Sequence, residues 1–126
     1  MTKEKFSGLL NAVSEKRYKH FLSITADSEY VWMVDCGNDN LLAFEMEGII
    51  HYLAWSEKEF VEYYLNKLYP KLDCEIVSIE IHAFCEMLKS NKSMFMIFPT
   101  DRDTWIVSSD ELSQNIEYEL ARIEQI

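Results

Sequence analysis

The chain of 126 residues is 48% hydrophobic and 13% aromatic, a composition that supports one hydrophobic core and excludes an intrinsically disordered chain. With 22 acidic against 12 basic residues the formal net charge is -10, which opposes binding to a phosphate backbone, so we expect no nucleic-acid partner. No apolar run is long enough to span a bilayer and the N-terminus shows no export signal, so we expect a cytoplasmic protein without membrane contact.

The first half of the sequence predicts helical structure followed by three strands. Apolar residues recur at helical spacing between residues 5 and 26, which indicates an N-terminal helix or helix pair. Three runs rich in β-branched and aromatic residues follow, at residues 29–35, 41–46 and 49–55. The connections between them contain glycine, asparagine or aspartate, as tight turns do. We therefore expect these three strands to form an antiparallel meander.

The second half alternates helices with strands. Ser56 and Glu59 have the spacing of a capping box and begin an amphipathic helix that Pro70 ends. A second helix has apolar residues at i, i+3, i+4 and i+7, counted from Ile81. A C-terminal helix carries one apolar face. Further strands are predicted at residues 75–79, 93–98 and 104–107.

These elements define the expected fold class. Their order is α-β-β-β-α-β-α-β-β-α with no linker between them, which predicts one α+β domain over residues 1–126. We expect a mainly antiparallel sheet of five to six strands. An N-terminal helix, two middle helices and a C-terminal helix would pack against this sheet and form one core.

Three aspartates in the segment FPTDRDTWIVSSDEL raise the possibility of paired catalytic carboxylates. Asp101 and Asp103 fall in the loop between the last two strands, where aspartate carboxylates accept hydrogen bonds from nearby backbone amides. Asp110 and Glu111 fall in the first turn of the C-terminal helix, and Ser108 with Glu111 has capping-box spacing. Local structure accounts for all of these residues, so we predict no catalytic set.

The histidines and cysteines form no recognisable metal or nucleophile motif. None of the three histidines and three cysteines has Cys-x-x-Cys or His-x-x-x-His spacing, so we predict no metal site. Cys85 lies on the apolar stripe of its helix, whereas Cys36 and Cys74 are better placed for reactivity but have no visible partner. We expect reduced thiols rather than a disulfide framework. With 3 glycines the chain lacks a phosphate-binding loop, so we predict no cofactor.

The tryptophans offer a candidate ligand pocket. Trp55 and His51 lie close to the start of the helix that follows Ser56, and the free backbone amides of a helix start can hold an anion. Together with Trp32 they form the candidate pocket of a small-molecule-binding protein. The alternative is that these side chains belong to the core, as most tryptophans do.

Exposed tyrosines and acidic residues offer a second kind of site. Tyr63 and Tyr118 lie off the apolar stripes of their helices, and exposed tyrosines are common in protein interfaces. The segment Asp110–Ile126 carries five acidic residues against one arginine, a charge of -4. Glu117 and Glu124 on this segment are candidate contacts for a basic partner. The alternative is an ordinary solvated helix face.

Several segments together resemble a known family. They are RYKHFL (17–22), EYVWMV (29–34), YLAWSEKEFVEYY (52–64), IEIHAFCEML (79–88), and FPT followed by WIVSSDEL and IEYEL. Their order and spacing resemble the small bacterial proteins catalogued as domain of unknown function 2750, over roughly residues 16–120. In that family the tryptophan matching Trp55 is often followed by proline, whereas Ser56 follows it here. The resemblance implies a small bacterial cytoplasmic protein with an α+β fold, and it supplies no established activity.

Two hypotheses about function follow from these residues. A small acidic domain without nucleotide or metal motifs fits a non-enzymatic protein-binding module of the immunity or accessory type, with a basic protein partner. The alternative is a small-molecule-binding protein or a small enzyme with its pocket near Trp32, His51 and Trp55. A DNA mimic is disfavoured because lysines interleave with the acidic residues. The sequence leaves the oligomeric state open.

Overall fold

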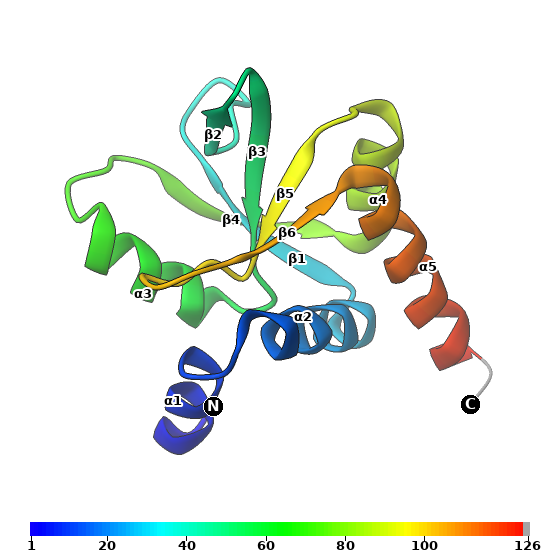
Figure 1. Cartoon of the computed structure of the whole chain (residues 1–126), viewed down its shortest axis with the longest axis horizontal. Helices are drawn as coiled ribbons and strands as arrows, with labels where there is room; N and C mark the ends of the chain where they lie inside the picture. Colours follow the sequence, from blue (N-terminus) through cyan, green and yellow to red (C-terminus); the bar gives the residue numbers. More distant parts are fainter. Residues whose placement is uncertain (125–126) are drawn as a thin grey trace.

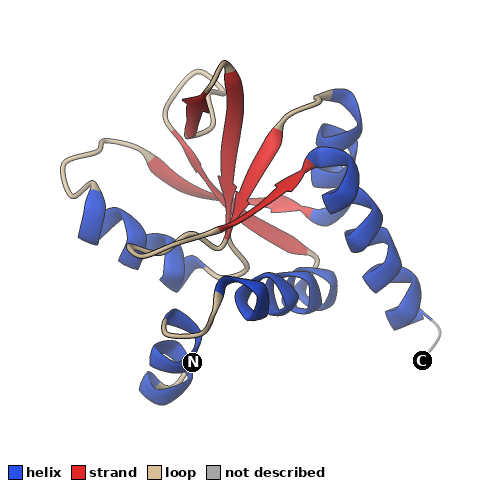
Figure 2. Cartoon of the chain, in the orientation of Figure 1, coloured by secondary structure: helices blue, strands red, loops and turns tan. Residues whose placement is uncertain are grey.

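The computed structural model describes residues 1–124, and Gln125 and Ile126 lie outside the described residues. Within that range the chain forms five helices and six strands, which confirms the predicted α+β class (Figures 1 and 2). The helices are α1 (Lys3–Leu10), α2 (Ser14–Ser28), α3 (Lys58–Leu68), α4 (Ile81–Ser90) and α5 (Ser109–Glu124). The strands are β1 (Tyr30–Asp35), β2 (Ala43–Met46), β3 (Ile49–Ala54), β4 (Glu75–Glu80), β5 (Met94–Ile97) and β6 (Trp105–Ser108).

The strands divide between two sheets rather than forming one. β1 and β4 form an antiparallel pair, and the other four strands form a sheet in the order β2-β3-β5-β6. Within the larger sheet β3 and β5 are parallel, whereas the other two pairings are antiparallel. The parallel pairing is possible because the chain crosses from β3 to β5 through α3, β4 and α4.

The predicted meander of the first three strands is wrong in one pairing. β2 and β3 do pair as a hairpin, but β1 pairs along its whole length with β4. β4 has six residues, as β1 does, so the two strands can pair along their whole length, whereas β2 has only four residues. β1 reaches the larger sheet through an isolated antiparallel bridge between Trp32 and Trp55. This bridge joins the two sheets into one framework.

The helices α2, α4 and α5 pack together against one face of the larger sheet. α5 contacts both α2 and α4, and the rings of Tyr18 in α2 and Trp105 in β6 stack 5.6 Å apart. Phe84 of α4 meets Phe95 of β5 edge to face, also at 5.6 Å. Phe95 and Val107 on this face are almost fully buried. One part of the hydrophobic core therefore lies between these three helices and the sheet, and the same core includes Phe60, Val61 and Tyr64 of α3.

Two predicted helix starts have different outcomes. The predicted capping box of Ser56 and Glu59 at the start of α3 is wrong, because the N-cap is Glu57 and no side chain caps the helix there. Ser56 donates its hydroxyl to the Glu57 carboxylate instead. At the start of α5 the Ser108 hydroxyl accepts a hydrogen bond from the Glu111 amide at 3.2 Å, as predicted.

Arg17 of α2 is fully buried and joins segments that are far apart in the sequence. Its guanidinium donates to the carbonyl oxygens of Ala12 at 2.6 Å, Phe98 at 3.2 Å and Asp103 at 3.1 Å. It also forms an ion pair with the Asp103 carboxylate at 2.5 Å. A buried guanidinium is stable only when its N–H groups are paired. The connection between α1 and α2 and the loop between β5 and β6 are therefore both held against α2.

We predict that Arg17→Lys lowers the free energy of unfolding by about 3 kcal/mol, because an ammonium cannot reach all of these acceptors and leaves buried carbonyls unpaired. The matched control is Arg102→Lys. Arg102 is exposed and donates to a single carbonyl, that of Leu10, at 2.7 Å, so we expect a loss below about 1 kcal/mol. Urea unfolding of both variants measures the difference. Equal losses in the two variants would contradict the role assigned to Arg17.

Candidate functional site

The second face of the four-stranded sheet is hydrophobic and only partly covered: Leu53 and His51 on it are buried, whereas the residues around them reach solvent. Side chains alternate between the two faces of a strand, so the residues next to the buried Phe95 and Val107 point to this second face. The register places them side by side: Met96 of β5 lies between Leu53 and Ile106. We call this surface the open face and define it by Phe44, Met46, Ile49, Met94, Met96 and Ile106.

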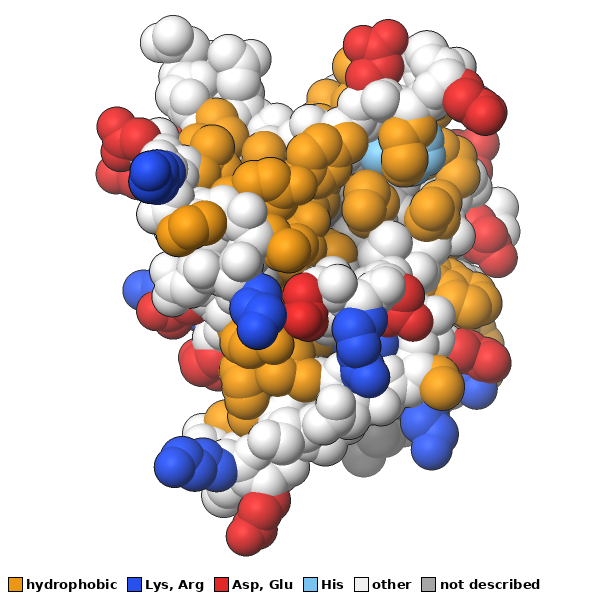
Figure 3. Space-filling view, turned by 60° about the vertical axis from the view of Figure 1, so that its left-hand side comes forward, with side chains coloured by type: hydrophobic (Ala, Val, Ile, Leu, Met, Phe, Trp, Pro, Cys, Tyr) orange, Lys and Arg blue, Asp and Glu red, His pale blue; other side chains and the backbone are white. Residues whose placement is uncertain are grey.

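The residues of the open face remain in contact with solvent. Ile49 and Ile106 each keep 49% of their surface exposed, and Met46 keeps 38%. Phe44, Met94 and Met96 are half-buried. Figure 3 shows a broad hydrophobic area on the side of the molecule where α3 and the β2–β3 hairpin come forward, with acidic and basic side chains around it. This face thus exposes hydrophobic side chains that a second layer of structure would ordinarily cover.

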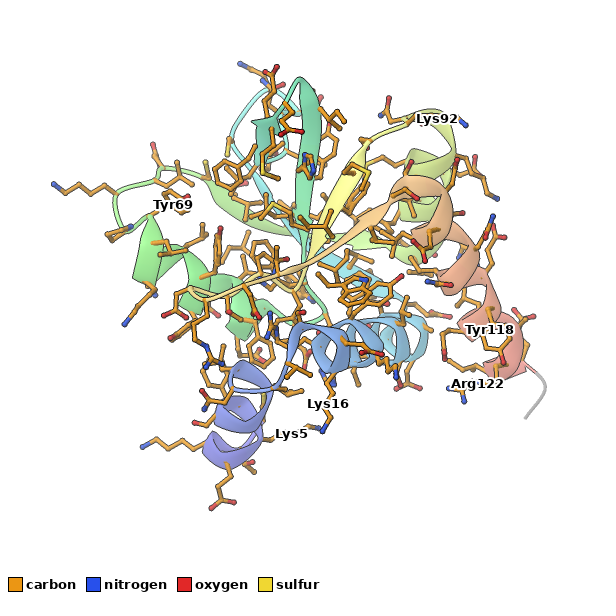
Figure 4. All side chains as sticks on the ribbon, in the orientation of Figure 1. Lys5, Lys16, Tyr69, Lys92, Tyr118 and Arg122 are labelled. Atoms are coloured by element: carbon orange, nitrogen blue, oxygen red, sulfur yellow. The ribbon has the colours of Figure 1, made fainter. Side chains whose placement is uncertain are left out.

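Residues at the end of α3 extend this hydrophobic surface. The ring of Tyr69, the residue after α3, lies 6.0 Å from the ring of Phe44. Tyr69 and Leu72 are 37% and 40% exposed. Figure 4 shows Tyr69 just beyond the last turn of α3. The surface therefore runs from the strands onto the connection between α3 and β4.

A contiguous hydrophobic surface is the typical mark of a docking site for another molecule. Met46, Met94 and Met96 make this surface adaptable, because the methionine side chain is flexible and polarisable. Our sequence prediction missed the open face. The signal was present in residues 94–97, which are apolar at every position, since a strand that is apolar on both faces needs a cover on both faces.

Of the predicted pocket residues, Trp32 and Trp55 are neighbours, whereas His51 lies four residues before Trp55 along the chain, about 13 Å away in an extended strand. Trp55 is fully buried and donates its indole N–H to the Pro99 carbonyl at 3.0 Å. Trp32 is half-buried and exchanges two backbone hydrogen bonds with Trp55, each 2.9 Å long. His51 is 7% exposed, and its Nδ1 lies 3.0 Å from the Ile49 carbonyl. A ligand-binding role for these three residues stays a prediction.

The predicted interface residues lie at separate places on the surface. Tyr63 lines a hollow of about 610 Å³ between α1 and α3, and its hydroxyl is 3.5 Å from the Asp101 carboxylate. Glu117 on α5 forms an ion pair with Lys89 at 2.9 Å, and Glu124 is exposed at the end of α5. Tyr118 is exposed on the outer side of α5 (Figure 4). Their contact with a partner stays a prediction.

The acidic character of α5 is partly offset by cations of the same chain. Besides the pair of Glu117 with Lys89, the Asp110 carboxylate lies 3.4 Å from Lys92. Arg122 donates to Glu119 at 2.8 Å. These side chains are mostly exposed, so each pair contributes little to stability, but each lowers the negative potential that a basic partner would meet.

The loop between β5 and β6 is organised by a residue that the sequence prediction overlooked. The Thr100 hydroxyl accepts hydrogen bonds from the backbone amides of Arg102 at 3.3 Å and Asp103 at 3.4 Å. The expectation that the carboxylates of Asp101 and Asp103 accept these hydrogen bonds is therefore wrong. The Asp103 carboxylate instead pairs with Arg17, which explains its position without a catalytic role.

A serine, a carboxylate and a histidine meet at the start of α3. His20 Nε2 lies 2.8 Å from Glu57 Oε1, and Ser56 donates its hydroxyl to the same oxygen. In a catalytic triad the histidine lies between the serine and the acid, so that it can take the serine proton. Here the acid lies between the other two, and Ser56 is buried. The cluster therefore joins α2 to α3 and does not activate a nucleophile.

The carboxyl of Glu57 is held in its charged form by this cluster. Burial on its own raises the pKa of Glu57, but hydrogen bonds from His20 and Ser56 and the positive charges of His20 and Lys5 outweigh burial. The net effect is a pKa below the ordinary value of 4.5. The charged carboxylate thus stabilises the contact between α2 and α3 at neutral pH.

No family model and no curated protein matches the sequence. Over residues 1–124 there is no group of three or more His, Cys, Asp or Glu residues arranged to hold a metal ion. In the same range no helix has the length and hydrophobicity needed to cross a bilayer.

We predict that the stabilising effect of Glu57 disappears in acid. Its pKa is lower in the folded state than in the unfolded state, so its contribution is present above about pH 4.5 and is lost as the pH falls through the folded pKa. The difference in free energy of unfolding between the wild type and Glu57→Gln should therefore shrink on acidification. Glu59→Gln, on the exposed side of the same helix turn, is the control and should show little change. A difference for Glu57→Gln that does not change with pH would contradict this assignment.

Proposed function

We propose that this chain is a non-enzymatic protein-binding module and that the open face is its docking surface. The observation that carries the proposal is the group of solvent-contacting hydrophobic side chains on the open face: the exposed Ile49 of β3 and Ile106 of β6 and the half-buried Met94 and Met96 of β5. Fully burying a large aliphatic side chain gains about 1.5–3 kcal/mol. Ile49 and Ile106 retain about half of their exposure, so covering them gains roughly 1 kcal/mol each.

The net charge of the chain indicates the chemistry of its proposed partner. The chain carries a net charge of -10, so a second copy of it would be repelled at long range, whereas a basic protein would be attracted. Acidic residues lie at both ends of the open face. Glu47 is exposed at the tip of the β2–β3 hairpin, and Asp101 is exposed in the loop between β5 and β6. The proposed partner presents apolar side chains flanked by lysine or arginine.

The proposed setting is the bacterial cytoplasm, with a role of the immunity or accessory type. This part of the proposal is supported by the resemblance to domain of unknown function 2750. The three free cysteines are compatible with a reducing compartment. A binding role fits the arrangement at the start of α3, where the cluster of Ser56, Glu57 and His20 is structural.

The proposal can be tested with a displayed library of random peptides selected on the folded chain. We expect the selected peptides to combine apolar residues with lysine or arginine. Their affinity should fall roughly tenfold or more in the double variant Ile49→Thr with Ile106→Thr, because two partly exposed apolar contacts are lost. Threonine keeps the β-branched shape, so the sheet should be retained. Fluorescence anisotropy of labelled synthetic peptides measures the affinities.

The control is Ile50→Thr. Ile50 is 48% exposed, almost as much as its neighbour Ile49, but it points to the opposite face of the sheet. The same peptides should bind this variant as they bind the wild type. If Ile50→Thr weakens binding as much as the double variant does, or if the peptides lack basic residues, the proposed docking surface or partner is wrong.

A further inference from the structure

Cys36 and Cys74 are far apart in the sequence but face each other across the β1–β4 pair. The last residue pair of this ladder joins Asp35 to Glu75. One further step in the same register joins Cys36, directly after β1, to Cys74, directly before β4. Cys36 is exposed and Cys74 is half-buried. The two thiols are therefore neighbours in the fold, which the sequence alone did not show.

Facing residues in an antiparallel pair of strands either exchange backbone hydrogen bonds or do not, and the Cα atoms are closer in pairs that do not. The backbone hydrogen bonds place Cys36 and Cys74 in a pair of this closer kind. Trp32 exchanges its backbone hydrogen bonds with Trp55, and Cys36 donates its amide to the Asn40 carbonyl at 2.8 Å. The even-numbered residues of β1 therefore direct their backbone groups away from β4. Residues that face each other without exchanging hydrogen bonds have Cα atoms about 4.5 Å apart. This separation lies within the range that a disulfide spans, about 4.4–6.8 Å.

Both cysteines line the same accessible hollow. It has a volume of about 170 Å³ and is lined by Asp35, Cys36, Gly37, Asp73, Cys74 and Glu75. Burial, the Cys74 thiol and the Asp35 carboxylate raise the pKa of Cys36 to about 11, with burial as the largest cause. At neutral pH the Cys36 thiol is therefore protonated, and the fraction of reactive thiolate rises about tenfold for each unit by which the pH rises toward the pKa.

We propose that Cys36 and Cys74 form a dithiol site that becomes a disulfide by exchange with a low-molecular-weight disulfide of the oxidised glutathione class. The thiolate of one cysteine attacks a sulfur of the small disulfide, which forms a mixed disulfide and releases one small thiolate. The second cysteine then attacks the protein sulfur of the mixed disulfide and releases the second small thiolate. The two protons lost by the cysteines pass to the two released thiolates. The protein is oxidised by two electrons and the small disulfide is reduced to two thiols.

The cross-link would close residues 37–73 into a covalent loop. This loop contains β2, β3 and α3, and so it includes the hairpin that carries Phe44, Met46 and Ile49. Joining the ends of a long segment reduces the conformational entropy of the unfolded chain and stabilises the folded one. The site is independent of the docking surface proposed above, because it depends only on the two thiols and their register.

The test treats the reduced, folded chain with oxidised glutathione under anaerobic conditions and stops the reaction with acid. The remaining thiols are alkylated in denaturant, and the products are mapped by mass spectrometry. We expect a disulfide between Cys36 and Cys74, with Cys85 alkylated, since Cys85 is buried. We also expect the thermal midpoint of the oxidised chain to rise by on the order of 5 °C.

Three serine variants complete the test. Cys85→Ser should give the same disulfide as the wild type. Cys36→Ser and Cys74→Ser should stop at a mixed disulfide with glutathione, because the second thiol is missing. The proposal is overturned if the wild type keeps glutathione on Cys36 while Cys74 is alkylated, or if Cys85 takes part in the disulfide. A thermal midpoint that falls on oxidation would also overturn it, because the two thiols would then meet only when the fold is distorted.

Discussion

The buried guanidinium of Arg17 is the interaction on which the arrangement of this fold depends. It fixes the loop between β5 and β6 through the carbonyls of Phe98 and Asp103, and it fixes the start of α2 through the carbonyl of Ala12. Phe98 has a positive φ of 51°, an unfavourable conformation for a bulky side chain. Its amide donates to the Ala54 carbonyl at 2.8 Å, and its ring lies 5.6 Å from the Arg17 guanidinium, so the surrounding contacts hold this conformation.

The position of the loop determines where the other helices can pack. The ring of Phe98 lies 4.5 Å from Phe60 of α3, and Phe60 in turn stacks on Phe6 of α1 at 4.8 Å. The helices α1, α2 and α3 are therefore gathered near the end of the sheet where β5 passes into the loop. α4 and α5 pack with α2 over one face of the sheet. The opposite face is covered only in part: Leu53 and His51 on it are buried, whereas Met94, Met96 and Ile106 meet solvent.

Local patterns in the sequence were sufficient to predict most elements, because periodicity and turn residues act over short distances. The stripe from Ile81 identified α4, and Ser108 with Glu111 identified the start of α5. The partner of β1 could not be predicted in this way, because β4 lies beyond a hairpin and a helix. The role of Arg17 was also hidden, since a buried arginine and an exposed one look the same in a helical pattern. The open face and the cysteine pair both depend on sheet register, which only the folded chain defines.

The central claim is that Met94, Met96 and Ile106 on the open face of the sheet are accessible in solution. Methyl NMR in the presence of a soluble nitroxide tests this claim directly, because the nitroxide broadens the signals of the methyl groups that it can approach. We expect strong broadening for Met94, Met96 and Ile106 and little broadening for the buried Ile97 and Ile116. Equal protection of both groups at low protein concentration would contradict the claim and would mean that some other layer covers this face.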